Sequence, residues 1–178
     1  MRIEYLSRKK LKSLLKELEN RSEIAREFIE MVSSCETAKI VIYDKFTIYV
    51  FDSTPMLFTN SRLGNALAPT LFVLNTLYNT KRLLVLPTVR VDSGAVDPIL
   101  RGADVMAPGI EHVYRDFDEG HLVAVMEPKE RYLIAVGIAL MSSTRILESR
   151  KGKAVRVASR LNDDVWQACL ELARKSGA

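Results

Sequence analysis

After Pro87, the chain is mostly a series of short apolar and β-branched runs that are separated by turn residues. The runs that we expect to form strands are Val105 to Ala107, Leu122 to Met126, Tyr132 to Met141 and Ala154 to Ala158. Turn residues separate them at Pro108-Gly109, Glu119-Gly120 and Gly152. Several short strands at such close spacing predict a small β-barrel or pseudobarrel.

A helix is expected at the end of the chain, from Asp163 to Lys175. Its apolar face would consist of Val165, Cys169, Leu170 and Ala173. The paired carboxylates Asp163 and Asp164 stand at its start, where they are most simply interpreted as an N-cap and a partner of the helix dipole.

The first part of the chain has the period of helices. Leucines recur at positions 11, 14, 15 and 18, which is one apolar stripe and predicts a helix from Ser7 to Asn20. Ser7 is the expected N-cap. A second helix is expected from about Ser22, with Ile24, Phe28, Met31 and Val32 facing inward.

The period then changes to that of strands. Lys39 to Tyr43 and Phe46 to Phe51 are rich in β-branched and aromatic residues, and Asp44-Lys45 between them predicts a hairpin. The other elements expected in this half are a short strand at Met56 to Phe58, a buried helix from Pro69 to Asn79 with Pro69 in its first turn, and a strand from Leu83 to Leu86.

These patterns predict an α+β protein with two domains. The N-terminal α/β domain is expected over residues 1–86, and the C-terminal domain, including the last helix, over residues 87–178. Hydrophobic residues make up 48% and charged residues 27% of the 178 residues, as in ordinary globular proteins.

The sequence shows neither a secretory signal nor a segment that could span a membrane. The N-terminus has no apolar core of the secretory type, and no run approaches 18 apolar residues. Cys35 and Cys169 lie far apart, which argues against a disulfide framework. We therefore expect a cytoplasmic protein.

Charge is unevenly distributed along the chain. The net charge of +4 permits a polyanionic partner without requiring one. Asp104 to Glu130 is mainly acidic, whereas Arg145 to Arg160 holds six basic residues and the single acid Glu148. The C-terminal half can therefore present one basic face to phosphates although its net charge is zero.

The sequence carries none of the common catalytic signatures. His112 and His121 have no metal-ligand spacing, no serine stands in a GxSxG frame, and no phosphate-binding glycine loop occurs. We expect a protein that is not an enzyme and that holds neither a cofactor nor a metal ion.

The most distinctive segment runs from Val91 to Ile110. Ser93-Gly94 is expected to open a short helix, whose unpaired N–H groups and small residues permit close approach of a ligand. Gly102 is expected to end this helix. Pro98 should then lie in the first helical turn, or the helix should start near Asp97.

This segment resembles the opening motif of PUA domains, which are RNA-binding modules. The residues that carry the resemblance are Asp92, Gly94, Ala95, Gly102, Ala103, Asp104, Val105, Met106, Pro108 and Gly109. Ile134 to Ser142, Lys151 to Val157 and Asn162 to Trp166 resemble the later pieces of the domain in the same order. Ala68 to Leu74 resembles the pre-PUA domain of the malignant T-cell-amplified-sequence family, particularly of its archaeal members.

The resemblance implies a pre-PUA α/β domain followed by a PUA pseudobarrel, with RNA beside the short helix and the strand after it. The residues that it places near RNA are Arg90, Ser93, Gly94, Ala95, Arg101, Gly102, Ala103, Met106, Ala107 and Pro108, and Lys151, Lys153 and Arg156 could extend a phosphate track. Each basic residue could instead be a solvated surface charge. Gly102, Gly109 and Gly137 could serve turns and close packing alone, and Trp166 could pack on the core or stack on a base.

The implied function is that of a translation-associated factor that recognises structured RNA, either tRNA or rRNA. Eukaryotic members of the family act on the small ribosomal subunit together with density-regulated protein, which implies an initiation-factor-like partner. One alternative is an enzyme whose N-terminal half modifies RNA delivered by the PUA domain, for which Asp44 and Asp52 are the candidate carboxylates, or an accessory or RNA-targeting subunit of an RNA-modification enzyme. Another is an adaptor whose N-terminal domain docks a partner protein.

Overall fold

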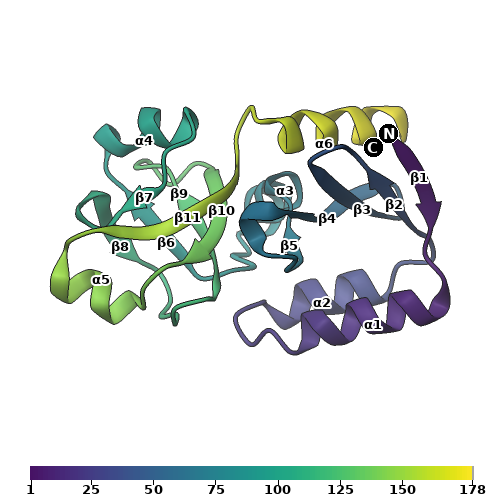
Figure 1. The fold of residues 1–178 in the computed structure, drawn as a ribbon, viewed down its shortest axis with the longest axis horizontal. Helices are drawn as coiled ribbons and strands as arrows, with labels where there is room; N and C mark the ends of the chain where they lie inside the picture. Colours follow the sequence, from purple (N-terminus) through teal and green to yellow (C-terminus); the bar gives the residue numbers. More distant parts are fainter. Residues whose placement is uncertain (178) are drawn as a thin grey trace.

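The computed structural model describes residues 1–177, and its fold is α+β, as predicted. Figure 1 shows two halves side by side, each built around its own sheet. The N-terminal sheet is antiparallel, in the order β1-β2-β3-β4-β5. Its strands are β1 (Arg2–Tyr5), β2 (Ala38–Ile42), β3 (Phe46–Phe51), β4 (Thr54–Asn60) and β5 (Ala68–Pro69). The predicted hairpin of β2 and β3 is confirmed, whereas β1 was not predicted.

The helices of this half are α1 (Arg8–Glu19), α2 (Arg26–Ser33) and α3 (Leu71–Lys81). The Ser7 side chain caps α1 by accepting from the amide of Lys10 at 3.2 Å, as expected. Two predicted starts are wrong. Helix α2 begins at Arg26 after the N-cap Ala25, not near Ser22. Helix α3 begins after Thr70, whose hydroxyl caps it by accepting from the amide of Val73. Pro69 therefore lies outside the helix and belongs to β5.

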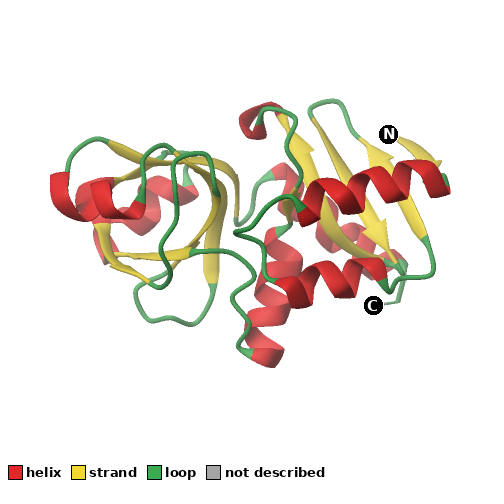
Figure 2. Cartoon of the chain, turned by 90° about the horizontal axis from the view of Figure 1, so that it is seen from below, coloured by secondary structure: helices red, strands yellow, loops and turns green. Residues whose placement is uncertain are grey.

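The C-terminal sheet has six strands in the order β7-β11-β10-β9-β6-β8 and curls around its own core (Figure 2). Its strands are β6 (Thr88–Val91), β7 (Val105–Met106), β8 (Ile110–Val113), β9 (Leu122–Met126), β10 (Leu133–Ala139) and β11 (Lys153–Arg160). Helix α4 (Ser93–Leu100) follows β6, and helix α5 (Ser143–Ser149) precedes β11. Neither β8 nor α5 was predicted.

The strand predicted at Leu83–Leu86 is absent from the described chain. This segment is the connection between the halves, and the carbonyl of Val85 accepts from the amide of Ala25 at 2.8 Å. Pro87 has no N–H to donate to a ladder, and β6 begins directly after it at Thr88.

The last helix, α6 (Asp164–Lys175), packs on the N-terminal sheet against β3 and β4 (Figure 1). Asp163 is its N-cap, as predicted, and accepts from the amide of Trp166 at 2.8 Å. Trp166 is partly buried against the larger core, which also includes residues of β9 and β10. The domain boundary between residues 86 and 87 stays a prediction.

Buried and partly buried polar contacts join the two halves. The side-chain amide of Asn75 on α3 bonds to both the N–H and the C=O of Leu133, at 2.8 and 3.0 Å. The carboxylate of the buried Glu23 accepts from the amide of Leu122 at 2.7 Å. On η1 (Ser61–Leu63), Arg62 donates to the carbonyl of Val157 at 2.9 Å. These contacts fix one half against the other.

None of the helices described over residues 1–177 is both long and apolar enough to cross a membrane.

Candidate nucleic-acid interface

Helix α4 forms one wall of a surface hollow. The Asp92 side chain caps this helix by accepting from the amide of Ala95 at 2.9 Å. The left-handed backbone at Gly102, with φ of +106°, follows the end of the helix, as predicted. Pro98 is not in the first turn but sixth of eight residues. Because Pro98 has no N–H, the carbonyl of Gly94 lacks its normal helical donor.

The hollow has a volume of about 420 Å³, and we call it the α4 hollow. The residues that line it are Asp92, Gly94, Ala95, Pro98, Ile99, Ala103, Asp104, Met106 and Gly109. Gly94 and Ala95 leave the backbone of the first turn open to close approach. Met106 is 46% exposed and offers an apolar surface to a flat ring. The hollow is therefore mainly apolar, with carboxylates at its edge.

The two carboxylates of the α4 hollow are already paired. Asp92 caps α4, and Asp104 accepts from Arg62 at 2.5 Å and from the amide of Val157 at 3.0 Å. Lys153 lies 3.6 Å from the second oxygen of Asp104. The side chain of Asp104 is only 12% exposed, so little negative charge faces a ligand.

Basic residues predicted from the sequence lie around the α4 hollow. Strand β7 pairs with β11, which places Lys153 opposite Met106, and the amide of Ala107 donates to the carbonyl of Gly152 at 2.8 Å. Lys151 is thereby held near the exposed Pro108. Arg101 is exposed at the end of α4 and, like Lys151, forms no ion pair within residues 1–177.

The structure does not bring all the predicted site residues together. Ser93 is exposed at the start of α4, and Ala107 is buried. Arg156 donates from Nε to the carbonyl of Arg62 and so lies at the junction of the halves. Arg160, which was not predicted as a site residue, donates to the carbonyl of Leu100, and its guanidinium lies beside Gly102.

Arg90 lies in a separate polar cluster. Its guanidinium donates to Glu130 at 3.0 Å, and the hydroxyl of Tyr114 donates to the same carboxylate. The hydrogen bonds from Tyr114 and Arg90 lower the pKa of Glu130, and burial together with the Glu130 hydrogen bond raises the pKa of Tyr114 to about 12. Arg90 is thus paired with carboxylates and does not line the α4 hollow.

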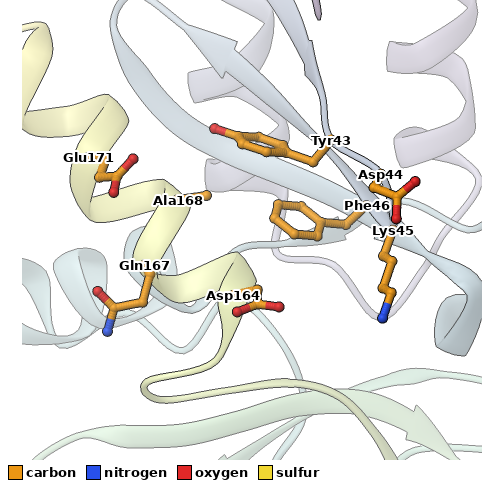
Figure 3. A pocket seen from close by; sticks show the side chains of 8 residues that line it. All are labelled: Tyr43, Asp44, Lys45, Phe46, Asp164, Gln167, Ala168 and Glu171. Atoms are coloured by element: carbon orange, nitrogen blue, oxygen red, sulfur yellow. The ribbon is translucent and has the colours of Figure 1, made fainter. Parts of the chain in front are cut away.

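A second hollow of about 400 Å³ lies between the β2–β3 turn and α6 (Figure 3). The rings of Tyr43 and Phe46 stack there with their centroids 4.6 Å apart. Asp44, Asp164 and Glu171 contribute carboxylates, and Lys45 is the only basic residue of the lining. The three carboxylates of this lining outnumber its one base by two, and the lining of the α4 hollow also carries two carboxylates. The carboxylates of the α4 hollow, however, are engaged by the Ala95 amide and by Arg62, which leaves less negative charge to repel phosphate, so of these two hollows the α4 hollow is the better fit for RNA.

Asp52 and the two cysteines lie in surroundings that suit a structural role rather than catalysis. The carboxylate of Asp52 accepts from the amides of Thr37 and Glu36 at 2.8 and 3.0 Å, and the Thr37 bond is the main cause of its lowered pKa. Burial raises the pKa of Cys169 to about 12 and that of Cys35 to about 11, so neither is an activated thiolate. No three His, Cys, Asp or Glu residues within 1–177 are placed to hold a metal ion.

Comparison with known proteins identifies the C-terminal half. The family model described as the PUA domain matches residues 87–161. Over 162 residues, the chain is 35% identical to an uncharacterized protein of Methanocaldococcus jannaschii, a match that covers 91% of this chain and 93% of that protein. The chain belongs to the family of PUA-domain proteins. Its PUA domain holds the whole lining of the α4 hollow.

The resemblance to the malignant T-cell-amplified-sequence family is also confirmed. Translation machinery-associated protein 20 of Saccharomyces cerevisiae is 29% identical over 91 residues, which are 48% of this chain and 50% of that protein. The malignant T-cell-amplified sequence 1 homolog of Drosophila melanogaster is 33% identical over 82 residues, 44% of this chain and 45% of that protein. The match thus covers about half of each protein.

A solved structure extends the likeness to the N-terminal half. The crystal structure of a hypothetical protein of Pyrococcus horikoshii superimposes with a TM-score of 0.81 at 32% identity. That match covers 94% of this chain and 99% of the other. The predicted arrangement, an N-terminal α/β part followed by a PUA pseudobarrel, is confirmed as the fold of this PUA-domain protein.

Proposed function

We propose that this chain is a non-catalytic RNA-binding protein that acts in translation and holds a structured RNA, tRNA or small-subunit rRNA, in the α4 hollow. The observation that carries the proposal is the combination of an apolar hollow with an open backbone at Gly94 and the basic side chains of Arg101, Lys151 and Lys153 around it. Apolar surface suits a base or a ribose, and basic side chains suit the phosphates.

The chemistry of the α4 hollow favours binding by shape and backbone contacts. An unstacked base can lie on the apolar side chain of Met106, and the small residues Gly94 and Ala95 leave room for the base or its ribose. Arg101 follows α4, whereas Lys151 and Lys153 lie on either side of Gly152 at the start of β11, so a phosphate backbone must follow the surface to contact all three. This geometry fits a folded RNA or its single-stranded end.

The proposal also covers the cellular role of the chain and its lack of catalytic activity. The yeast relative is named for the translation machinery, which supports a role in translation. The proposal places that role in the cytoplasm, on the small ribosomal subunit, together with an initiation-factor-like protein. The hydrogen bonds of Asp52 to the Glu36 and Thr37 amides and the raised pKa values of Cys35 and Cys169 support a protein that binds RNA without transforming it.

The proposal predicts a salt-dependent affinity for tRNA that depends on the basic residues of the hollow. The triple variant Arg101→Ala, Lys151→Ala and Lys153→Ala should reduce the slope of log K against log salt by about two to three, because each phosphate contact contributes roughly one unit. Filter binding to tRNA and to small ribosomal subunits across a salt series measures this slope.

The matched control removes the same charge elsewhere. Lys9, Lys10 and Lys12 are exposed on α1, in the half of the molecule that lacks the α4 hollow. Their triple alanine variant should bind RNA with nearly the native slope. Equal slopes for the native chain and the α4-hollow variant would contradict the proposed site, and no binding at low salt would contradict the proposed function.

A further inference from the structure

The first strand of the chain leaves an open edge on the N-terminal sheet. Within residues 1–177, β1 pairs with β2 alone, and it is the last strand of its sheet (Figure 1). Six large hydrophobic side chains are exposed within residues 1–177, and three of them are Met1, Ile3 and Tyr5 of this edge, with exposures of 77, 48 and 82%. An open edge with an exposed apolar row is a template for another strand.

One hydrogen bond shows which backbone groups of β1 face the open edge. The amide of Leu6 donates to the carbonyl of Ala38 at 3.1 Å, across the β1–β2 pair. In an antiparallel ladder the residues of a strand turn their backbone groups alternately to its two sides, so Glu4 and Arg2 also face β2. The N–H and C=O groups of Ile3 and Tyr5 therefore point to the open edge.

We propose that β1 pairs with β1 of a second copy of this chain, antiparallel about a twofold axis at Ile3, which joins two five-stranded sheets into one. In this register Ile3 lies opposite Ile3 of the second copy, and the two residues exchange both backbone hydrogen bonds. Met1 lies opposite Tyr5. Two copies of this edge in antiparallel orientation therefore place apolar residues opposite apolar residues.

Charge selects this register over its neighbours. Arg2 lies opposite Glu4 of the second copy at both ends of the pair, in positions where side chains on opposing strands approach most closely. A shift by two residues in one direction would place Arg2 opposite Arg2 of the second copy. A shift by two residues in the other direction would place Glu4 opposite Glu4, so both shifted registers bring like charges together. Within one chain the two side chains already form an ion pair of 3.0 Å and stay 71 and 38% exposed, so both are accessible to a second copy.

The apolar residues complete the fit. Tyr5 borders a hollow of about 220 Å³ together with Lys39 and Val50. In the proposed pair, Met1 of the second copy lies beside this hollow, where its thioether can contact the ring of Tyr5. A five-residue edge is much smaller than the roughly 800 Å² per partner of a stable interface, so the dimer is weak and forms at high concentration.

Sedimentation velocity of the untagged chain, from about 10 μM to about 1 mM, tests the pairing in the range of weak association. The native chain should show a dimer fraction that rises with concentration. Arg2→Glu and Glu4→Arg should each weaken the dimer about tenfold, because each variant places like charges opposite each other at both ends. The double variant Arg2→Glu with Glu4→Arg should restore native dimerisation.

Amide hydrogen exchange by NMR provides a second readout at the same concentrations. The amides of Ile3 and Tyr5 should exchange more slowly as concentration rises, whereas those of Glu4 and Leu6, which already bond to β2, should not change. A native chain that stays monomeric at 1 mM, or a double variant no better than the single ones, overturns the proposal. Protection of Ile3 and Tyr5 only in the presence of another protein would assign the edge to a different strand and would also overturn it.

Discussion

Replacing Gly137 with alanine is expected to lower the free energy of unfolding by about 3 kcal/mol or more, the upper end of the cost of overpacking. Gly137 lies on β10, where the ladder with β11 shifts register. A Cβ at this position would lie 2.0 Å from the carbonyl oxygen of Arg156 and 3.0 Å from the Cα of Val157. These are backbone atoms of a paired strand, so they cannot rotate away and the sheet itself must deform.

Chemical denaturation of the variant, followed by circular dichroism, measures the loss. A decrease of 3 kcal/mol corresponds to a melting temperature lower by roughly 6 to 12 °C for a chain of this size. The control is Gly94→Ala, since the added Cβ would find its nearest neighbour, the carboxylate of Asp92, at an ordinary 3.5 Å. That control should be neutral or slightly stabilising. A Gly137→Ala protein within about 1 kcal/mol of native stability would show that the β10–β11 geometry is wrong.

Asn75→Ala is expected to cost about 2 to 4 kcal/mol, because it leaves two buried backbone groups without partners. Asn75 is 8% exposed on α3 and accepts from the amide of Leu133 while donating to its carbonyl. Leu133 is the first residue of β10 and is itself buried, so water cannot replace the lost bonds. The same variant loosens the contact between the N-terminal half and the PUA domain.

The matched control is Asn79→Ala, one turn further along α3 at an exposed position. Its effect should stay within about 0.5 kcal/mol. Hydrogen exchange should also show faster opening of β10 in Asn75→Ala than in the control. If the two variants unfold at the same denaturant concentration, the Asn75 bridge does not stabilise the junction.

The elements that could be predicted from the sequence are those with strong local signals. Helix α1 combines a leucine stripe with a serine cap, and β3 and β9 are uninterrupted strand-forming runs, so their positions do not depend on distant residues. Strand β1 has only four residues and little burial, and its pairing with β2 is a contact between segments more than 30 residues apart. Such pairing leaves no local pattern.

The segment at 83–86 shows a second reason why prediction from the sequence fails. Its apolar residues were interpreted as a strand, but their burial comes from the junction of the halves rather than from a ladder. Periodicity reports burial and does not say which partner provides it. Pro98 in α4 was misplaced for a related reason: an eight-residue helix with an Asp92 cap tolerates proline near its end, where only one helical hydrogen bond is lost.

The candidate site was predicted in part. Of the residues that the motif predicts near RNA, Gly94, Ala95, Ala103 and Met106 line the α4 hollow, because a short helix and the strand after it are close in sequence and in space. That RNA binds there stays a prediction. The pairing of Asp104 with Arg62 was missed, since these residues are 42 positions apart and come from different halves. This ion pair decides how much negative charge the α4 hollow presents, and only the three-dimensional structure reveals it.

Crosslinking of tRNA and ribosomal RNA to the native chain and to Gly94→Glu tests the central claim most directly. The introduced side chain would place a carboxylate at the open turn of α4, where it repels phosphate and blocks the hollow. We expect RNA crosslinks at the hollow to fall at least about tenfold in Gly94→Glu and less in Gly94→Ala, which adds a methyl group but no charge, with both proteins folded. Undiminished crosslinks in a folded Gly94→Glu protein would show that RNA binds to a different face.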